Sequence, residues 1–195
     1  MAVSIDRANA EDLPAILDLL TRSDLPQEGL SDHLATTLVA RAGQTVVGSA
    51  ALELYGTAAL LRSVAVEQAL RGQGLGGRLT QATLALARQR GVTYVYLLTE
   101  TAGEFFPRFG FHPIARSQVP PAVQRSVEFT SVCPASALVM ELHLEGLDEK
   151  ERLGHCNFTP TEVLYAFYRL VDMVNNPPPY QPVRRSFLPL VMRAL

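Results

Sequence analysis

The chain of 195 residues has few of the features that several protein classes require. Its two cysteines, Cys133 and Cys156, are too few for a disulfide scaffold and lack the spacing of a metal site, so we expect no metal. A net charge of only −2 argues against a nucleic-acid-binding protein that works through bulk charge. No apolar run approaches the ~20 residues of a membrane span, and the N-terminus lacks the apolar core of a signal peptide. The simplest expectation is a cytoplasmic protein with neither a membrane nor a nucleic-acid partner.

Apolar residues are abundant, at 48%, and the length predicts one domain of ordinary size plus an additional segment. Hydrophobic spacing predicts both strands and helices, which indicates a mixed α/β (α+β) fold. Loop-like residues 24–33 are expected to line a substrate cleft, and 116–134 form a long excursion between elements. The expected strands are 3–7, 36–41, 45–55, 58–66, 92–98, one that begins at 110–111, and 137–144; the expected helices are 9–23, 76–90 and a short one at 101–109.

The most specific motif is a basic, glycine-rich turn that follows the apolar run 60–66 and leads into the helix at 76–90. Backbone N–H groups at the start of a helix bind anions well when no Cβ atoms stand in the way. The turn therefore predicts a pyrophosphate site.

Three known types of phosphate-binding loop are possible interpretations of this turn. A Walker A loop is excluded because no lysine follows the glycines. The glycines at 72–77 satisfy the Rossmann spacing, but hairpin residues precede them and the following strand ends in Leu-Leu-Thr instead of an acidic residue. The third pattern, Arg-x-x-Gly-x-Gly, is met by Arg71, Gly74 and Gly76. A tight turn that needs glycines only for packing is the structural alternative.

The element order β-α-β-β-β-α-β-α-β-β resembles that of the GCN5-related N-acetyltransferases (GNAT) over residues 1–146. The Arg-x-x-Gly-x-Gly turn and the sequence Phe-Phe-Pro-Arg-Phe-Gly-Phe at 105–111 carry this resemblance. It implies a mixed central sheet with an antiparallel N-terminal meander and a splayed cleft for CoA. It also implies acetyl transfer from acetyl-CoA to the primary amine of a small molecule.

Four stretches are similar to acetyltransferases encoded with arsenic-resistance genes. That similarity implies an amino-acid-like acceptor such as arsinothricin or phosphinothricin. The stretches are 52–56, 60–66, 101–106 and 127–137.

The glycine turn and the strand before it are expected to bind acetyl-CoA. Backbone groups of 63–66 are expected to pair with the pantetheine arm as an added strand, and the N–H of Val64 or Ala65 to bind the oxyanion. The expected cofactor-binding residues are Val64, Ala65, Val66, Arg71, Gly72, Gln73, Gly74, Leu75, Gly76, Gly77 and Phe106.

The resemblance places Glu53 close to the acceptor amine as the base. That role needs burial to raise its pKa towards neutrality. The alternative is a solvent-facing partner of Arg62. Tyr55 shares the face of Glu53 and is expected to shape the same pocket. Arg62, with Arg116 and Arg125 as other choices, would bind an anionic acceptor through its guanidinium group.

The chain departs from its relatives at Phe106, where many acetyltransferases carry a tyrosine that protonates the thiolate. Water or another hydroxyl, from Ser63, Thr99 or Thr101, would have to replace it. Of these we assign Ser63 to the catalytic residues and Thr99 to the substrate-binding ones. The missing tyrosine also leaves a second function open, an acyl-CoA-binding sensor or scaffold without turnover.

The resemblance ends near residue 146, and 147–195 are expected to form a helical C-terminal extension. Thr159-Pro160-Thr161-Glu162 is a capping box with proline at the first helical position. An apolar stripe follows it and must dock on its own domain, across a homodimer or on another protein.

Overall fold

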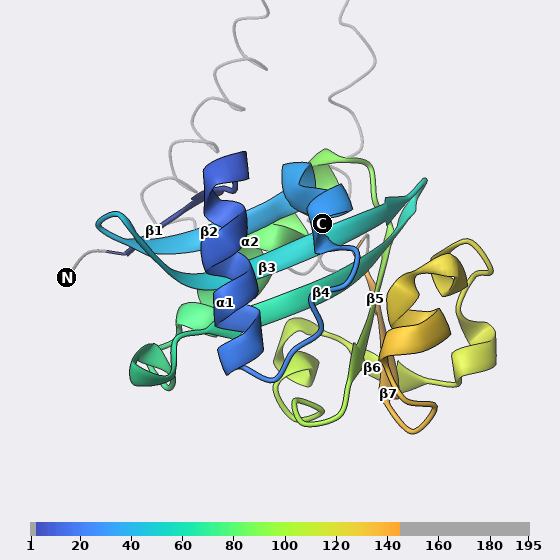
Figure 1. Cartoon of the computed structure of the whole chain (residues 1–195). Coiled ribbons are helices and arrows are strands. Elements are labelled where there is room, and N and C mark those ends of the chain that lie inside the picture. The colour runs from blue at the N-terminus through green and yellow to red at the C-terminus, as the bar shows by residue number, and fades with distance from the viewer. Residues whose placement is uncertain (1–2, 145–195) are drawn as a thin grey trace, which may run out of the picture. The chain divides into compact units, whose positions relative to one another are not determined.

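The computed structural model describes residues 3–144, so the helical extension expected at 147–195, and its part in dimerisation, lie outside the described residues. The elements are β1 (Val3–Arg7), α1 (Leu13–Arg22), β2 (Thr37–Ala42), β3 (Thr45–Tyr55), β4 (Ala58–Val66), α2 (Leu75–Gln89), β5 (Tyr94–Thr99), β6 (His112–Ile114) and β7 (Leu138–His143) (Figure 1). Within this range no helix is long and apolar enough to cross a membrane.

All seven strands form one mixed sheet in the order β1-β2-β3-β4-β5-β7-β6. Strands β1 to β4 are an antiparallel meander, as the sequence predicts. Strands β4 and β5 then pair in parallel, and β7 pairs antiparallel with both β5 and β6. The predicted mixed α+β fold is therefore confirmed.

The two α-helices cover opposite faces of the sheet (Figure 1). Because side chains alternate along a strand, Leu38 and Ala40 of β2 pack in the core of α2, while Val39 packs with α1. The excursion before β7 covers the remaining part of the α1 face, where Val119 packs with Leu60 of β4. On this face of the sheet, α1 covers one part and the excursion covers the other, and β4 contacts both of them.

Three predicted segments differ from the structure. The loop expected at 24–33 coils into 3-10 turns from Leu30 onward, over Leu30–Thr36. The short helix expected at 101–109 is reduced to the 3-10 turn Phe106–Phe109, because Pro107 starts it and Gly110 ends it at a φ of 93°. The excursion is not an open loop, since it contains 3-10 turns and the π-helical turn Glu128–Val132.

Gly48 of β3 allows α2 to approach the sheet closely. A Cβ atom built there would lie 2.7 Å from Leu79 Cδ1 and 3.2 Å from the carbonyl oxygen of Ala65. Gly48→Ala should therefore lower the free energy of unfolding by about 1–3 kcal/mol through overpacking. Urea unfolding measures this.

Gly77→Ala is the control for this substitution. Its Cβ would meet Phe109 Cζ at an ordinary 3.7 Å, and alanine favours a helix over glycine by about 0.5–1 kcal/mol. Equal stability of the two variants would contradict the close packing of α2 at Gly48.

Candidate active site

The site begins where β4 and β5 separate. Their parallel pairing ends at Leu60 and Tyr96, although β4 continues to Val66 and β5 to Thr99. The edge of β4 that faces β5 therefore has no strand partner beyond Leu60 within the described residues. Such an edge can bind an extended amide-containing ligand by adding it as a strand.

A bulge in β4 lies at the same place. The register on β3 moves from Ala51 opposite Arg62 to Ser49 opposite Ala65, so β4 holds one extra residue. Ser63 has a φ of 55°, a left-handed conformation that is uncommon for a residue other than glycine. Its carbonyl accepts a hydrogen bond from Ser49 Oγ at 2.9 Å. The bulge turns the backbone of β4 at the mouth of the opening between β4 and β5.

The glycine-rich turn joins this end of β4 to α2. Gly72 and Gly74 have φ values of 77° and 79°, and a Cβ atom at either would meet nothing within 4 Å. The first helical bond runs from Arg78 N–H to the carbonyl of Gly74, so the N–H groups just before it precede the helical ladder. The turn thus has the open backbone expected for an anion site.

Arg71 holds the turn in place. Its Nε donates to the carbonyl of Val66 at 2.9 Å, and its Nη2 donates to Ser23 Oγ at 3.3 Å. The side chains of Ala65, Val66 and Leu75 are buried in the core, so only their backbone groups are available to a ligand.

A cavity of about 840 Å³ lies where the two strands diverge. Its described walls come from the α1–β2 loop around 23–28, from 60–63 of β4, from 98–101 at the end of β5, and from Glu128 with 132–134 of the excursion. Thr99 lines the cavity, and its Oγ1 accepts the N–H of Ala102 at 2.9 Å.

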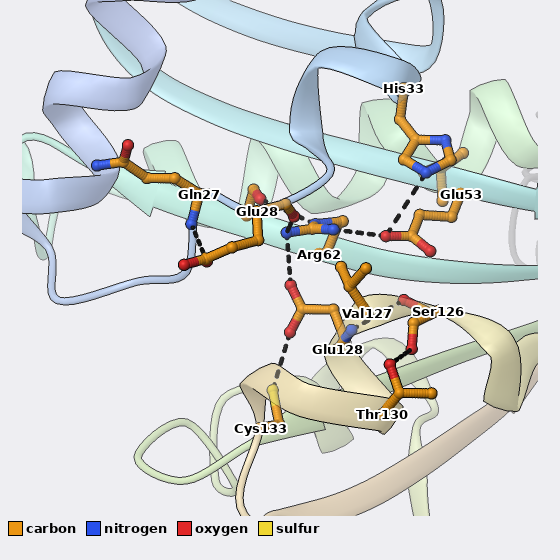
Figure 2. A network of polar contacts seen from close by, with 12 residues as sticks. Gln27, Glu28, His33, Glu53, Arg62, Ser126, Val127, Glu128, Thr130 and Cys133 are labelled. Carbon is orange, nitrogen blue, oxygen red and sulfur yellow. Dashed lines mark hydrogen bonds and ion pairs between the residues drawn. The ribbon is translucent and has the colours of Figure 1, made fainter.

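Arg62 is the centre of a buried polar network beside this cavity (Figure 2). Its Nη1 donates to Glu53 Oε1 at 2.5 Å, and its Nη2 donates to Glu128 Oε1 at 2.8 Å. Nη2 also lies 2.8 Å from the carbonyl oxygen of Glu28, and Nε 3.3 Å from Ser63 Oγ. Only 2% of the Arg62 side chain is exposed. This guanidinium therefore joins β3, β4, the α1–β2 loop and the excursion.

Glu53 is buried, as its predicted role requires, but its pKa is not raised. Burial alone would raise the pKa, whereas hydrogen bonds from Tyr55, Ser126 and Arg62 outweigh it and lower the pKa of Glu53 below its ordinary value. Tyr55 Oη donates to Glu53 Oε2 at 2.6 Å, and burial with this carboxylate raises the pKa of Tyr55 to about 12. The alternative of a solvent-facing Glu53 is wrong, because only 1% of its side chain is exposed.

Several expected site residues lie apart from the cavity. Of the described residues, neither Glu53 nor Tyr55 is among those that line it; Arg62 is. Phe106 is 6% exposed and packs edge-on against Phe105 and Phe111 in the core. Its position gives no support to a contact with the cofactor.

Glu128 and Cys133 are among the cavity residues that sequence reasoning missed. The Cys133 thiol donates to Glu128 Oε2 at 2.8 Å, and burial beside this carboxylate raises the pKa of Cys133 to about 12. One signal was available: Arg62 stands inside an apolar strand, and a buried guanidinium requires carboxylate partners. Glu128 is the acidic residue within 116–134 that could supply one.

Comparison with known proteins decides the fold family. Residues 33–113 match the family model of the acetyltransferase (GNAT) domain. Rv2747 from Mycobacterium tuberculosis, solved in complex with CoA, superposes with a TM-score of 0.62 at 27% identity, over 72% of this chain and 98% of that one. The fold is that of the GNAT acetyltransferases. The opening between β4 and β5 corresponds to the splayed cleft that the resemblance implies.

Two further comparisons point to the same fold. An uncharacterized N-acetyltransferase from Chlorobaculum tepidum is 31% identical over 99 residues, which are 50% of this chain and 63% of that protein, less than two thirds of its length. N-acetylglutamate synthase from Neisseria gonorrhoeae, complexed with coenzyme A and N-acetyl-glutamate, has a TM-score of 0.64 at 22% identity, over 74% of this chain and 35% of that one. The comparisons support the GNAT fold, and none of them supports the arsenic-resistance subtype.

Glu53→Gln tests the buried network through its pH dependence. At pH 7 the variant should lose about 3 kcal/mol of unfolding free energy, because Arg62 loses a buried carboxylate partner. Since the folded pKa of Glu53 lies below its ordinary value of 4.5, this stabilisation is present above that pH and is lost as the pH falls through the folded pKa.

The difference between Glu53→Gln and the unsubstituted protein should therefore shrink on acidification. Urea unfolding from pH 7 down to pH 3 measures it, with Glu104→Gln, at an exposed position, as the control. A difference that stays constant with pH would contradict an ionised Glu53 in this network.

Proposed function

We propose that the protein is an N-acetyltransferase that moves an acetyl group from acetyl-CoA to the primary amine of a small molecule. The observation that carries the proposal is the unpaired edge of β4 that leads directly into the open glycine turn. The edge suits the amides of a pantetheine arm, and the turn suits a pyrophosphate. The cavity beside them has room for an acceptor.

The transfer needs four contributions from the protein. It must hold the thioester, deprotonate the acceptor ammonium, stabilise the tetrahedral oxyanion and protonate the thiolate. The nitrogen then forms its bond to the acetyl carbon as the carbon–sulfur bond breaks, and CoA leaves as the thiol. For the oxyanion we propose the N–H of Val64 or Ala65, because the bulge leaves one residue of β4 outside the pairing with β3.

The acid–base groups remain proposals. A base must reach the acceptor, and Glu53 lies behind Arg62 with a lowered pKa. These facts favour a positioning role for Glu53, which fixes Arg62 through a charged hydrogen bond. Ser63 lines the cavity and carries a hydroxyl near the predicted thioester, so it stays our candidate for the catalytic hydroxyl.

An amino-acid-like acceptor, such as arsinothricin or phosphinothricin, is the finer expectation from sequence. Its carboxylate would need a cation, and Arg62 is the arginine in the described lining of the cavity. N-acetylglutamate synthase has an amino-acid product in its crystal structure, but its likeness to this chain concerns the fold. The expectation therefore enters the experiment as one acceptor among several.

Release of free thiol from acetyl-CoA tests the proposed reaction. The acceptor panel contains amino acids, phosphinothricin, diamines, simple monoamines and a lysine peptide. Turnover with any of them, with the N-acetyl product identified by mass spectrometry, supports the proposal. Tight binding of acetyl-CoA without turnover of any acceptor would instead favour an acyl-CoA-binding sensor or scaffold, and absence of binding would refute both.

Gly74→Ala tests the proposed pyrophosphate turn. Its new Cβ would stand in the open space where the anion should approach, and we expect the KM for acetyl-CoA to rise about tenfold, the loss of one hydrogen bond to a charged group. The control is Gly91→Ala, which has a φ of 74° and equally open surroundings but lies beyond the other end of α2.

Both alanine variants should lose a similar amount of stability, about 1 kcal/mol, because each forces alanine into a left-handed conformation. An equal rise of the KM for acetyl-CoA in both would show that strain, and not anion binding, causes the effect.

A further inference from the structure

We infer that the acceptor is a basic amine, a diamine or polyamine with a second cationic group besides the one that is acetylated. This inference rests on the proposed function, because it assigns the acceptor to the same cavity. The described lining contains four carboxylates, those of Asp24, Glu28, Glu100 and Glu128, against the single guanidinium of Arg62. Such an excess of negative charge attracts cations and repels anions.

Arg62 corrects little of this imbalance, because four of its five N–H donors already face partners within the protein. Nη1 binds Glu53, Nη2 binds both Glu128 and the carbonyl of Glu28, and Nε faces Ser63 Oγ. A carboxylate, phosphinate or arsinate group on a substrate would need free guanidinium donors. A bidentate contact would have to displace at least one of these partners, and displacement of Glu53 or Glu128 would leave a buried carboxylate uncompensated, which is strongly unfavourable.

Glu128 is placed to receive an ammonium group. It is 6% exposed and lines the cavity, with Arg62 on Oε1 and the Cys133 thiol on Oε2. Each carboxylate oxygen has a second lone pair, so Glu128 retains capacity to accept from a substrate. The cavity is therefore not merely acidic at its rim, since it has a fixed and buried carboxylate in its wall.

The balance of buried charge also favours a cationic guest. Glu53 and Glu128 share one guanidinium, which leaves one negative charge in excess within the network. His33 Nε2 lies 3.7 Å from Glu53 Oε1, so a protonated His33 would act on the Glu53 side; it is not among the described residues that line the cavity. An ammonium group beside Glu128 compensates the excess on the cavity side.

The outer carboxylates extend this preference along the cavity. Asp24 and Glu28 belong to the α1–β2 loop and Glu100 follows β5, so they come from two separate segments of the wall. All three residues are exposed, and their attraction for a cation is correspondingly weaker and sensitive to salt. In a polyamine, a further ammonium group on the flexible chain can interact with these carboxylates while another ammonium group lies beside Glu128.

Calorimetric titration of the protein loaded with CoA tests the inference by binding, independently of turnover. The ligands are 1,4-diaminobutane, butylamine, L-glutamate and phosphinothricin. We expect the diamine to bind at least about tenfold more tightly than butylamine, the effect of one charged hydrogen bond, and the two anionic ligands to bind more weakly still. Glu128→Gln keeps the shape of the side chain and a hydrogen-bond acceptor for Arg62. It should abolish the tighter binding of the diamine relative to butylamine.

Glu100→Gln is a second variant, away from the buried network, and should reduce diamine binding by about threefold at low salt. Glu104→Gln, an exposed position outside the described lining, is the matched control and should change nothing. If Glu128→Gln does not fold, the comparison of Glu100→Gln with Glu104→Gln carries the test.

Four results test this inference, and the last two separate it from the proposed function. Tighter binding of glutamate or phosphinothricin than of the diamine overturns the inference, and so does a diamine affinity that neither Glu128→Gln nor Glu100→Gln changes. Thiol release with an anionic acceptor, without diamine binding, overturns the inference and supports the proposed function. Diamine binding without thiol release from acetyl-CoA supports a cavity that binds cations but overturns the inference that the diamine is the acceptor.

Discussion

The burial of one guanidinium group, that of Arg62, constrains how the described part of the chain is arranged. A charge in the interior is tolerated only when carboxylates and other acceptors surround it. Glu53 provides the first partner from the neighbouring strand, at the diagonal position across the β3–β4 pair. The other acceptors must come from distant segments, so the α1–β2 loop and the excursion both close over the same point of β4. Gly29 permits this approach, because a Cβ there would lie 3.1 Å from Val127 Cγ2.

Strand β4 serves the cofactor side and the acceptor side of the cleft at once. Before the bulge, Leu60 and Arg62 point to the face that α1 and the excursion share; after it, Ala65 packs with α1. The extra residue at Ser63 therefore resets the alternation of side chains while the strand still pairs with β3. Its other edge, free of β5 beyond Leu60, is left for a ligand.

The match to the GNAT model covers the two sides of the cleft to different extents. The matched GNAT range, residues 33–113, contains β4, the glycine turn and α2, which form the proposed cofactor side. Glu128 and Cys133 of the excursion follow that range, and Asp24 and Glu28 precede it. The acceptor side is therefore built mostly from segments that the family match does not include. A shared fold need not bring a shared acceptor, since specificity depends on the side chains grafted onto it.

The order of elements, the antiparallel meander and the glycine turn can be predicted from the amino-acid sequence alone. These depend on local causes, namely side-chain alternation, helical spacing and the backbone freedom of glycine, which residues close together in the chain reveal. The sequence did not determine what Glu53 does, because the pKa of that carboxyl depends on Arg62, Tyr55 and Ser126 acting together. Nor did it place Phe106 in the core or Glu128 in the cavity wall. These features become visible in the folded chain, because desolvation and charge pairing depend on distances between segments that are far apart in the sequence.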